Sequence, residues 1–146
     1  MKMTYRKMIP DDYDAVLEMM RTFYTSPAVA TDGSEEIYRA DIAACLDRDT
    51  PLTGYVFISG DAFAGYAMTA HSYSTEYGRP CIWIEDLYLR PEARGQGMGK
   101  RFLRELAAAN PNAVLRLEAE TENAPAVHVY RSVGFKEVPY LELWKL

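Results

Sequence analysis

Arg94-Gly95-Gln96-Gly97-Met98-Gly99-Lys100 is the stretch that best indicates the fold of this chain. Three glycines alternate with other residues between two basic side chains. The preceding residues 82–89 are apolar and aromatic, which predicts a strand, and in the following segment Met98, Phe102 and Leu106 recur at helical spacing. The glycines are therefore expected at a strand-to-helix turn, where free backbone N–H groups can bind an oxyanion. The stretch predicts a phosphate or pyrophosphate site.

Spacing distinguishes this turn from two familiar nucleotide-binding loops. A Walker A loop has four residues before its Gly-Lys pair and Ser or Thr after it. Here three residues separate Gly95 from Gly99-Lys100, and Arg101 follows. A dinucleotide fingerprint needs Gly-x-Gly-x-x-Gly, and Gly95-x-Gly97-x-Gly99 is one residue short. A turn that merely joins a strand to a helix needs fewer glycines and no flanking Arg, so a binding turn is the favoured interpretation.

The pattern Arg94-x-x-Gly97-x-Gly99 resembles the Gln/Arg-x-x-Gly-x-Gly/Ala signature of the GNAT N-acetyltransferase superfamily, in which the loop binds the pyrophosphate of acetyl-coenzyme A (acetyl-CoA). The resemblance implies the GNAT acyl-CoA N-acyltransferase fold and acetyl-CoA as co-substrate. It also implies that a neutral amine attacks the thioester directly, while a backbone N–H of residues 87–89 polarises the thioester carbonyl. The expected cofactor contacts are Leu87, Tyr88, Leu89, Arg94, Gly95, Gln96, Gly97, Met98, Gly99 and Lys100.

A second stretch reads Asn123-x-x-Ala126-x-x-x-Tyr130-x-x-x-Gly134-Phe135. Helical spacing places Ala126 and Tyr130 on one side, Asn123 can cap the helix, and Gly134 can end it in the left-handed conformation. From spacing alone, the favoured interpretation of Tyr130 is a core aromatic with a satisfied hydroxyl. The stretch also resembles the second coenzyme A-contacting motif of the same family. That resemblance adds Asn123, Ala126 and Tyr130 to the cofactor contacts, and it makes Tyr130 the acid that protonates the departing thiolate.

Glu85 and Asp86 are adjacent on the predicted strand, so alternation directs their side chains to opposite faces. A buried carboxylate needs water or a partner. Two roles therefore remain possible for Glu85. It can be a structural residue in a salt bridge, or it can be a general base that acts directly or through water. Glu85-Asp86 followed by the glycine turn resembles the spermidine/spermine acetyltransferase branch, in which the corresponding Glu is a proposed base. This likeness does not assign the substrate.

The composition predicts a single domain over residues 1–146. Hydrophobic residues make up 49% and charged residues 25%, as in globular proteins. A net charge of −5 argues against a nucleic-acid partner and fits a cationic substrate. Cys45 and Cys81 form no Cys-x-x-Cys motif, which fits a reduced compartment. With no apolar run of membrane-spanning length and no signal peptide at the start, we expect a cytoplasmic protein without a membrane partner.

Periodicity predicts strands, helices and one polar loop in the order β-α-α-β-β-β-α-β-α-β-β. The expected strands are residues 4–8, 55–59, 63–70, 81–89, 114–119, 135–138 and 141–146; the expected helices begin at Pro10 and Ser34 and span 98–109 and 123–133; the loop is 72–80. A strand, helix and strand around the glycine turn require a parallel pair, whereas the earlier hairpin is antiparallel. The fold class is therefore α/β (α+β), with a mixed, mostly antiparallel central sheet of six to seven strands flanked by helices.

Acidic residues on the first two helices favour a cationic amine as acceptor: Asp11, Asp12, Asp14, Glu18, Glu35, Glu36 and Asp41. The expected acceptor contacts are Tyr24, Tyr73, Tyr77 and Glu85. His71 could replace Glu85 as the base, although a structural His is the favoured interpretation. Lys100, Arg101 and Arg104 are expected either on a solvated face or at a 3′-phosphate. No Cys or His cluster predicts a metal.

Two classes of function fit these observations. The first is an N-acetyltransferase acting on the primary amine of a small cationic molecule, or alternatively on a protein N-terminus or lysine. The second is a non-catalytic acyl-CoA-binding or regulatory module with the same turn. Tyr130 and a polar residue at Glu85 favour the enzyme. Family resemblance also suggests a homodimer.

Overall fold

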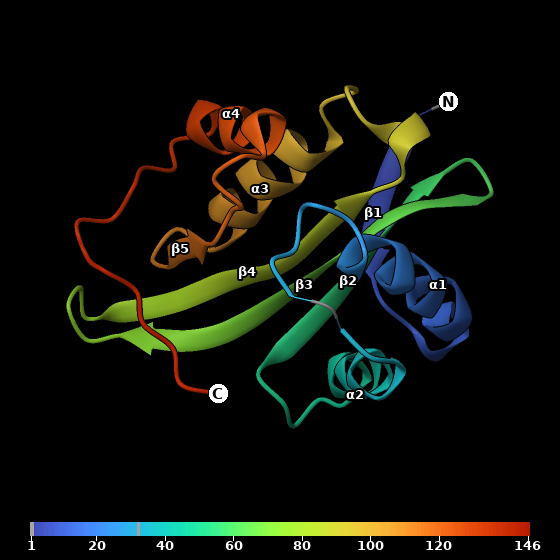
Figure 1. The fold of residues 1–146 in the computed structure, drawn as a ribbon, viewed down its shortest axis with the longest axis horizontal. Coiled ribbons are helices and arrows are strands. Elements are labelled where there is room, and N and C mark those ends of the chain that lie inside the picture. The colour runs from blue at the N-terminus through green and yellow to red at the C-terminus, as the bar shows by residue number, and fades with distance from the viewer. Residues whose placement is uncertain (1, 32) are drawn as a thin grey trace.

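One mixed sheet carries the fold of the computed structural model, which describes residues 2–31 and 33–146 (Figure 1). The elements are β1 (Met3–Lys7), the short 3-10 helix η1 (Pro10–Asp12), α1 (Tyr13–Tyr24), α2 (Glu35–Leu46), β2 (Leu52–Ser59), β3 (Ala62–Ser74), β4 (Arg79–Leu89), the 3-10 helix η2 (Pro91–Ala93), α3 (Met98–Ala109), β5 (Val114–Leu117) and α4 (Ala124–Ser132). Among the described residues, five strands form the sheet in the order β1-β2-β3-β4-β5. Neighbouring strands are antiparallel except β4 and β5, which are parallel as predicted.

Each face of the sheet packs against a different pair of helices (Figure 1). The stripe of α1 and the apolar face of α2 bury Met19 and Ile42 in one core. On the opposite face, α3 buries Phe102 and Leu106, and Tyr130 of α4 packs against the same core. The helical periodicities seen in the sequence are thus confirmed, because each apolar stripe is the face that meets the sheet.

The long β3–β4 hairpin corrects the predicted loop at residues 72–80. Strand β3 continues to Ser74 and β4 begins at Arg79, so only four residues turn the chain. Within the turn, Gly78 has a φ of +62°. The polar side chains of this segment predicted a loop, but this end of the hairpin is largely exposed to solvent, so its strands need no apolar face.

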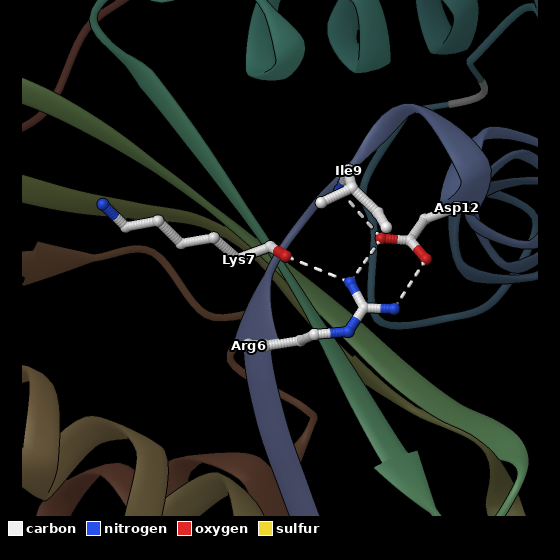
Figure 2. Close-up of polar contacts among 4 residues, drawn as sticks. All are labelled: Arg6, Lys7, Ile9 and Asp12. Carbon is white, nitrogen blue, oxygen red and sulfur yellow. Dashed lines mark hydrogen bonds and ion pairs between the residues drawn. The ribbon is translucent and has the colours of Figure 1, made fainter.

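An ion pair between half-exposed Arg6 and buried Asp12 fixes the chain between β1 and α1 (Figure 2). Arg6 donates two hydrogen bonds to the Asp12 carboxylate, at 2.8 and 2.9 Å, and the Ile9 N–H donates a third at 2.8 Å. Burial acts to raise the pKa of Asp12, but these hydrogen bonds and the Arg6 charge hold it below its ordinary value. The acidic residue predicted at the start of this helix is therefore an anchor between helix and sheet.

The C-terminal part of the chain differs most from the sequence-based expectation. Residues 135–138 and 141–146 are not strands, and β5 ends at Leu117, so the predicted sheet of six to seven strands is wrong. None of the backbone hydrogen bonds among the described residues involves residues 136–146. A strand-type sequence becomes a strand only when another strand pairs with it, and this segment has no such neighbour in the single chain.

Candidate active site

The glycine turn connects η2 to the N-terminus of α3. Gly95 and Gly97 have φ values of +76° and +79°, a conformation that side chains other than glycine rarely adopt. A Cβ added at either position would meet nothing within 4 Å. Glycine is therefore needed here for its backbone conformation, and the space beside the turn is open.

This turn leaves a continuous set of backbone donors free. Among the described residues, none of the N–H groups of residues 95–100 donates a hydrogen bond, and the first bonded one is Arg101, whose N–H reaches the Gly97 carbonyl at 2.9 Å. The partial positive charge of the α3 N-terminus adds to their effect. A cavity of about 270 Å³ beside them is lined by Lys2, Met3, Gln96, Gly97, Met98 and Arg101. This arrangement has the donors, the charge and the room to bind a phosphate group.

The basic side chains near the turn have two different roles: some contact other parts of the protein, and others are available to a ligand. Arg94 donates to the Leu89 carbonyl at 2.9 Å and lies over the Tyr88 ring, so it fastens the turn to the end of β4. Arg101 donates to Glu105 and to the Met3 carbonyl, which ties α3 to β1. The Met98 side chain is in the core, so only its backbone N–H can meet a ligand. Lys100 and Arg104 form no ion pair among the described residues.

Strand β4 extends beyond its pairing with β5. The two strands pair only from Cys81–Val114 to Ile84–Leu117, and β5 ends there while β4 goes on to Leu89. The Arg90 N–H bonds to Ala64 of β3, so strand alternation directs the backbone groups of Leu87 and Leu89 toward the side that β5 has left. Leu87 and Leu89 thus carry the free N–H groups predicted for this strand, whereas those of Tyr88 face β3.

Tyr130 and Asn123 lie on α4 with unused hydrogen-bonding groups. The Tyr130 ring packs against the α3-side core and near Phe135, but its hydroxyl forms no hydrogen bond with a described residue. Burial raises the pKa of Tyr130, so the hydroxyl keeps its proton at neutral pH. The side chain of Asn123 does not cap α4, contrary to the sequence-based prediction. Gly134 ends the helix at a φ of +104°, as predicted.

A β-bulge at Glu85 changes which face each carboxyl group occupies. Met68 lies opposite Asp86 and Thr69 opposite Ile84, so Glu85 has no partner on β3. Ile84 accordingly packs in the α3-side core, while Asp86, two positions later, lies on the α1 and α2 side with Tyr66. The extra residue interrupts the alternation. Simple alternation therefore no longer assigns Glu85 and Asp86 to opposite faces, and that assignment stays a prediction.

Two tyrosines hold the Asp86 carboxylate. Tyr24 donates to one oxygen and Tyr66 to the other, each at 2.7 Å. Asp86 is only 4% exposed, and burial raises its pKa although the two hydroxyl groups act against that rise. The buried acid on β4 is thus Asp86, while Glu85 is exposed to solvent.

Asp41 of α2 joins this group, which we call the carboxyl cluster: Asp41, Glu85 and Asp86. Burial and the charges of Asp86 and Glu85 raise the pKa of Asp41 to about 6. Burial and Asp86 likewise raise the pKa of Glu85. The sequence named Asp41 only as one acid among seven, because no sequence spacing places α2 beside β4. Burial raises the pKa of all three carboxyl groups, and a neighbouring carboxylate adds to the rise at Asp41 and Glu85, so a cation would stabilise this site.

The other candidates from the sequence lie outside the carboxyl cluster. Tyr73 and Tyr77 are exposed at the far end of the β3–β4 hairpin, where Tyr73 pairs with Pro80. His71 lines a cavity of about 310 Å³ under α3, and its Nε2 lies 3.4 Å from the Thr53 hydroxyl. Within the described part of the chain, no group of His, Cys, Asp and Glu side chains is arranged to hold a metal. Nor is any described helix both long and apolar enough to cross a membrane.

This fold and this site define a protein that can hold an anionic group at a strand-to-helix turn and that also carries a cluster of carboxyl groups on the α1 and α2 side of the sheet. Residues 13–135 match the acetyltransferase (GNAT) family. The chain therefore belongs to this family of acyltransferase enzymes, and the resemblance seen in the glycine turn is confirmed.

Two curated relatives carry the name thialysine N-epsilon-acetyltransferase. The protein of Sus scrofa is 34% identical over 121 residues, which cover 76% of this chain and 69% of the relative. That of Bos taurus is 35% identical over 88 residues, 58% of this chain and 51% of the relative, so the match spans about half of its length. A third relative, N-alpha-acetyltransferase RimI of Mycobacterium tuberculosis, is 37% identical over 83 residues, 55% of this chain and 49% of the relative.

Solved structures show the same fold at low sequence identity. A possible acetyltransferase from Clostridium difficile 630 superposes with a TM-score of 0.81 at 19% identity, covering 99% of this chain and 97% of the other. The aminoglycoside N-acetyltransferase AAC(6′)-Iy in complex with CoA superposes with a TM-score of 0.80 at 16% identity, covering 99% of this chain and 95% of the other. The architecture is thus that of acetyltransferases.

Proposed function

We propose that this protein transfers the acetyl group of acetyl-CoA to a primary amine of a small cationic molecule. The observation that carries the proposal is the run of free N–H groups at residues 95–100, together with the end of β4 that extends beyond its pairing with β5. A diphosphate followed by a long, flexible arm fits a donor-rich turn followed by a strand edge. The solved structure of AAC(6′)-Iy, which shares the fold, contains CoA.

In this proposal the cofactor contacts follow the structure from the turn to α4. The N–H groups of residues 95–100 and the Gln96 side chain hold the diphosphate, with Lys100 beside them. The pantetheine arm lies along Leu87 and Leu89 and meets Asn123 and Ala126 of α4. Met98 contributes only its backbone, because its side chain is buried. Tyr88 supports the site by packing under Arg94.

Acetyl-CoA supplies an acetyl thioester, whose carbon–sulfur bond breaks as the carbon–nitrogen bond of the product amide forms. The site's residues bind and orient both reactants, which removes much of the entropic barrier. The N–H of Leu87 or Leu89 donates to the carbonyl oxygen as negative charge develops there. Tyr130 gives its proton to the sulfur, and the proton that the amine nitrogen loses as the amide forms returns to the Tyr130 oxygen, directly or through water. Its raised pKa keeps the hydroxyl protonated for this role.

The carboxyl cluster binds the acceptor and takes its proton. A primary amine is mostly protonated near pH 7, so it must lose a proton before it attacks. Glu85 is the exposed member, and its raised pKa makes it a better base than an ordinary glutamate, either directly or through water. Tyr24 and Tyr66 keep Asp86 in place, so Asp86 is a positioning residue. Tyr73 and Tyr77 could reach only the distal part of an extended acceptor.

The names of the relatives support an amine acceptor. Two are thialysine acetyltransferases, and a structural neighbour is an aminoglycoside acetyltransferase. A protein N-terminus is the second candidate, because the RimI relative is named an N-alpha-acetyltransferase. Action in the cytoplasm, a homodimeric state and the absence of nucleic-acid and membrane partners stay predictions of the sequence.

An amine panel tests the proposal. The purified chain and acetyl-CoA are incubated with thialysine, lysine, a polyamine, an aminoglycoside and a peptide with a free N-terminus, and products are detected by mass. We expect acetylation of a small polycationic amine and little of the peptide. Preferred acetylation of the peptide would make the protein N-terminus the acceptor. Binding of CoA without any product would instead support the non-catalytic module.

A further inference from the structure

A cavity of about 310 Å³ lies between the sheet and the C-terminal half of α3, and the residues of the proposed reaction do not line it. Its walls come from β1, β2 and β3 on one side and from α3 on the other. It shares no lining residue with the cavity beside the glycine turn, which lies at the opposite end of the same helix. A cavity of this size is at the lower end of those that bind small molecules.

The inner part of this cavity is apolar and aromatic. Phe102 and Leu106 of α3 are only 1% and 7% exposed, so they form its floor. The Tyr5 and Tyr55 rings meet the Phe102 ring edge-on, with centroids separated by 5.2 and 5.1 Å. These packed rings form flat apolar walls, which suit the body of an aliphatic or aromatic ligand.

The rim of the cavity carries polar groups that the protein leaves available. Lys7 is exposed, its side chain points away from the nearby ion pair (Figure 2), and it forms no ion pair with any described residue. The Nε2 atom of His71 lies 3.4 Å from the Thr53 hydroxyl. Lys7 lies opposite Tyr55 in the sheet, and Thr53 precedes Tyr55 by two residues, so these side chains share one face. The polar groups therefore gather at one end of the cavity.

The carboxylate at the cavity already has its partners. Glu105 accepts a hydrogen bond from the Tyr5 hydroxyl at 2.6 Å on one oxygen and from Arg101 at 2.9 Å on the other. The Tyr5 hydrogen bond, together with Arg101, holds the pKa of Glu105 below its ordinary value. Among the described residues that line the cavity, the charge left without a partner is that of Lys7. An anion would neutralise it.

We propose that this cavity binds a small carboxylic acid with an apolar body, at a site separate from that of acetyl transfer. The carboxylate lies at the rim, where the Lys7 ammonium and the Thr53 hydroxyl reach it. The body lies on the floor, against Phe102 and Leu106. Burial of the body supplies most of the affinity, and the charge at the rim fixes its orientation.

Other classes of ligand match the cavity less well. A phosphate carries more negative charge than the single ammonium of Lys7 offsets, and it would leave the apolar floor unfilled. An amine would meet the charge of Lys7, and both oxygens of Glu105 are already occupied. A monocarboxylate matches the free charge in both sign and number.

Calorimetry and amide NMR on the full chain test the inference with three probes of similar shape: benzoate, benzamide and benzylamine. Benzoate should bind with a Kd of about 1 mM, as expected for a molecule of this size. It should shift the amide signals of Lys7, Thr53 and Leu106. Benzamide and benzylamine should bind at least about tenfold more weakly, because neither carries a negative charge. Saturating CoA should leave the affinity for benzoate unchanged, since the two cavities share no lining residue.

Three variants locate the site. Lys7→Met keeps an aliphatic stem and removes the charge, so it should weaken benzoate binding by about fivefold and leave thermal unfolding unchanged. Ala109→Trp, at an exposed position in the cavity wall, should abolish binding by filling the cavity. Lys136→Met removes an exposed charge that lies after α4, and this matched control should bind benzoate as the parent chain does.

Four results would contradict the inference. Equal affinity for benzoate and benzamide would exclude a carboxylate-specific site. Displacement of benzoate by CoA, or amide shifts confined to residues 95–100, would place the binding at the glycine turn. Failure to approach saturation by about 20 mM benzoate would leave no site of the expected affinity. Parent-like binding by both folded Lys7→Met and folded Ala109→Trp would show that the probe binds elsewhere.

Discussion

At the scale of single residues, the site contains two kinds of residue. Some owe their role to their own backbone conformation, and others owe it to the side chains that surround them in the fold. Gly97 belongs to the first kind, because its positive φ and the free N–H groups after it are local properties. Tyr130 and Asp41 belong to the second. The hydroxyl of Tyr130 has no hydrogen-bond partner among the described residues, and the pKa of Asp41 is raised by burial and by two acids of β4.

Gly97→Glu should abolish binding of CoA. The substitution places a carboxylate among donors that would hold a phosphate, and it forces a side chain into a left-handed conformation at a cost of about 1–2 kcal/mol. Gly78→Glu is a matched control, because Gly78 also has a positive φ but lies at the hairpin turn. Calorimetry with CoA should show binding in the control alone. Equal affinity in a folded Gly97→Glu protein would show that the turn does not hold the diphosphate.

Tyr130→Phe should lower kcat by roughly a hundredfold and leave the affinity for CoA nearly unchanged. The ring keeps its packing against the core, and only the proton donor is lost. Tyr13→Phe is the control, since Tyr13 packs against the core on the other face of the sheet. Steady-state kinetics and calorimetry separate the two effects. Normal turnover in Tyr130→Phe would make Tyr130 a packing residue.

Asp41→Asn should change how stability depends on pH. The folded state raises the pKa of Asp41 to about 6 from an ordinary value of about 3.9. The folded state therefore favours the protonated form, and stability is lost as the pH rises through about 6. In Asp41→Asn, thermal unfolding should change less between pH 5 and pH 8, and the melting temperature at pH 8 should exceed that of the parent. In the control Asp11→Asn, at an exposed residue, the melting temperature should depend on pH as it does in the parent chain. The same pH dependence in Asp41→Asn would show that Asp41 does not belong to the carboxyl cluster.

At the scale of elements, the position of α1 relative to β1 depends on the Arg6–Asp12 ion pair (Figure 2). This junction sets where α1 lies on the sheet, and Tyr24 at the end of α1 reaches Asp86. The anchor at one end of the helix thus supports the site at the other end.

Arg6→Met should destabilise the protein by about 2 kcal/mol at pH 7, because Asp12 remains buried without its counter-ion. We place the value below the roughly 3–5 kcal/mol that breaking a fully buried pair costs, since Arg6 is half exposed. Chemical denaturation at pH 7 measures the loss. A double variant with Asp12→Leu should recover part of it, and a loss equal to the sum of the single changes would mean that the two residues do not interact.

Lowering the pH should remove the stabilisation that the Arg6–Asp12 ion pair gives to the folded state. The pKa of folded Asp12 is below its ordinary value, so its stabilising effect is present at neutral pH and is lost as the pH falls through that lower pKa. The difference in unfolding free energy between the parent chain and Arg6→Met should therefore narrow below about pH 4. A difference that stays constant down to pH 2 would contradict the assignment.

At the scale of the whole molecule, the net charge of −5 and the carboxyl cluster would act together on the proposed cationic acceptor. Such a field attracts a cation and weakens as salt is added. For a polycationic acceptor, kcat/KM should fall several-fold between about 50 and 500 mM salt. The binding of CoA, an anion, should not weaken in parallel with it. A salt-independent kcat/KM would argue for a neutral acceptor.

The sequence by itself determined the features that depend on near neighbours in the chain. The glycine turn before α3, the apolar stripes of α1 and α3, and the parallel pair around them follow from local conformation and periodicity. The turn and the stripes can each be stated from fewer than about twenty adjacent residues, because helix and turn geometry repeat over short distances, and the parallel pair follows from the strand, helix and strand that succeed one another along the chain. The GNAT signature is of this kind, and it was confirmed.

Only the tertiary structure decided which acids meet and which strands pair. The bulge at Glu85 depends on register with β3, and a one-residue shift reverses the faces of the residues that follow. Asp41 joins Asp86 through the packing of α2, which no spacing in the sequence encodes. Residues 135–146 have a strand-type sequence but no strand beside them, since pairing depends on a partner and not on propensity alone.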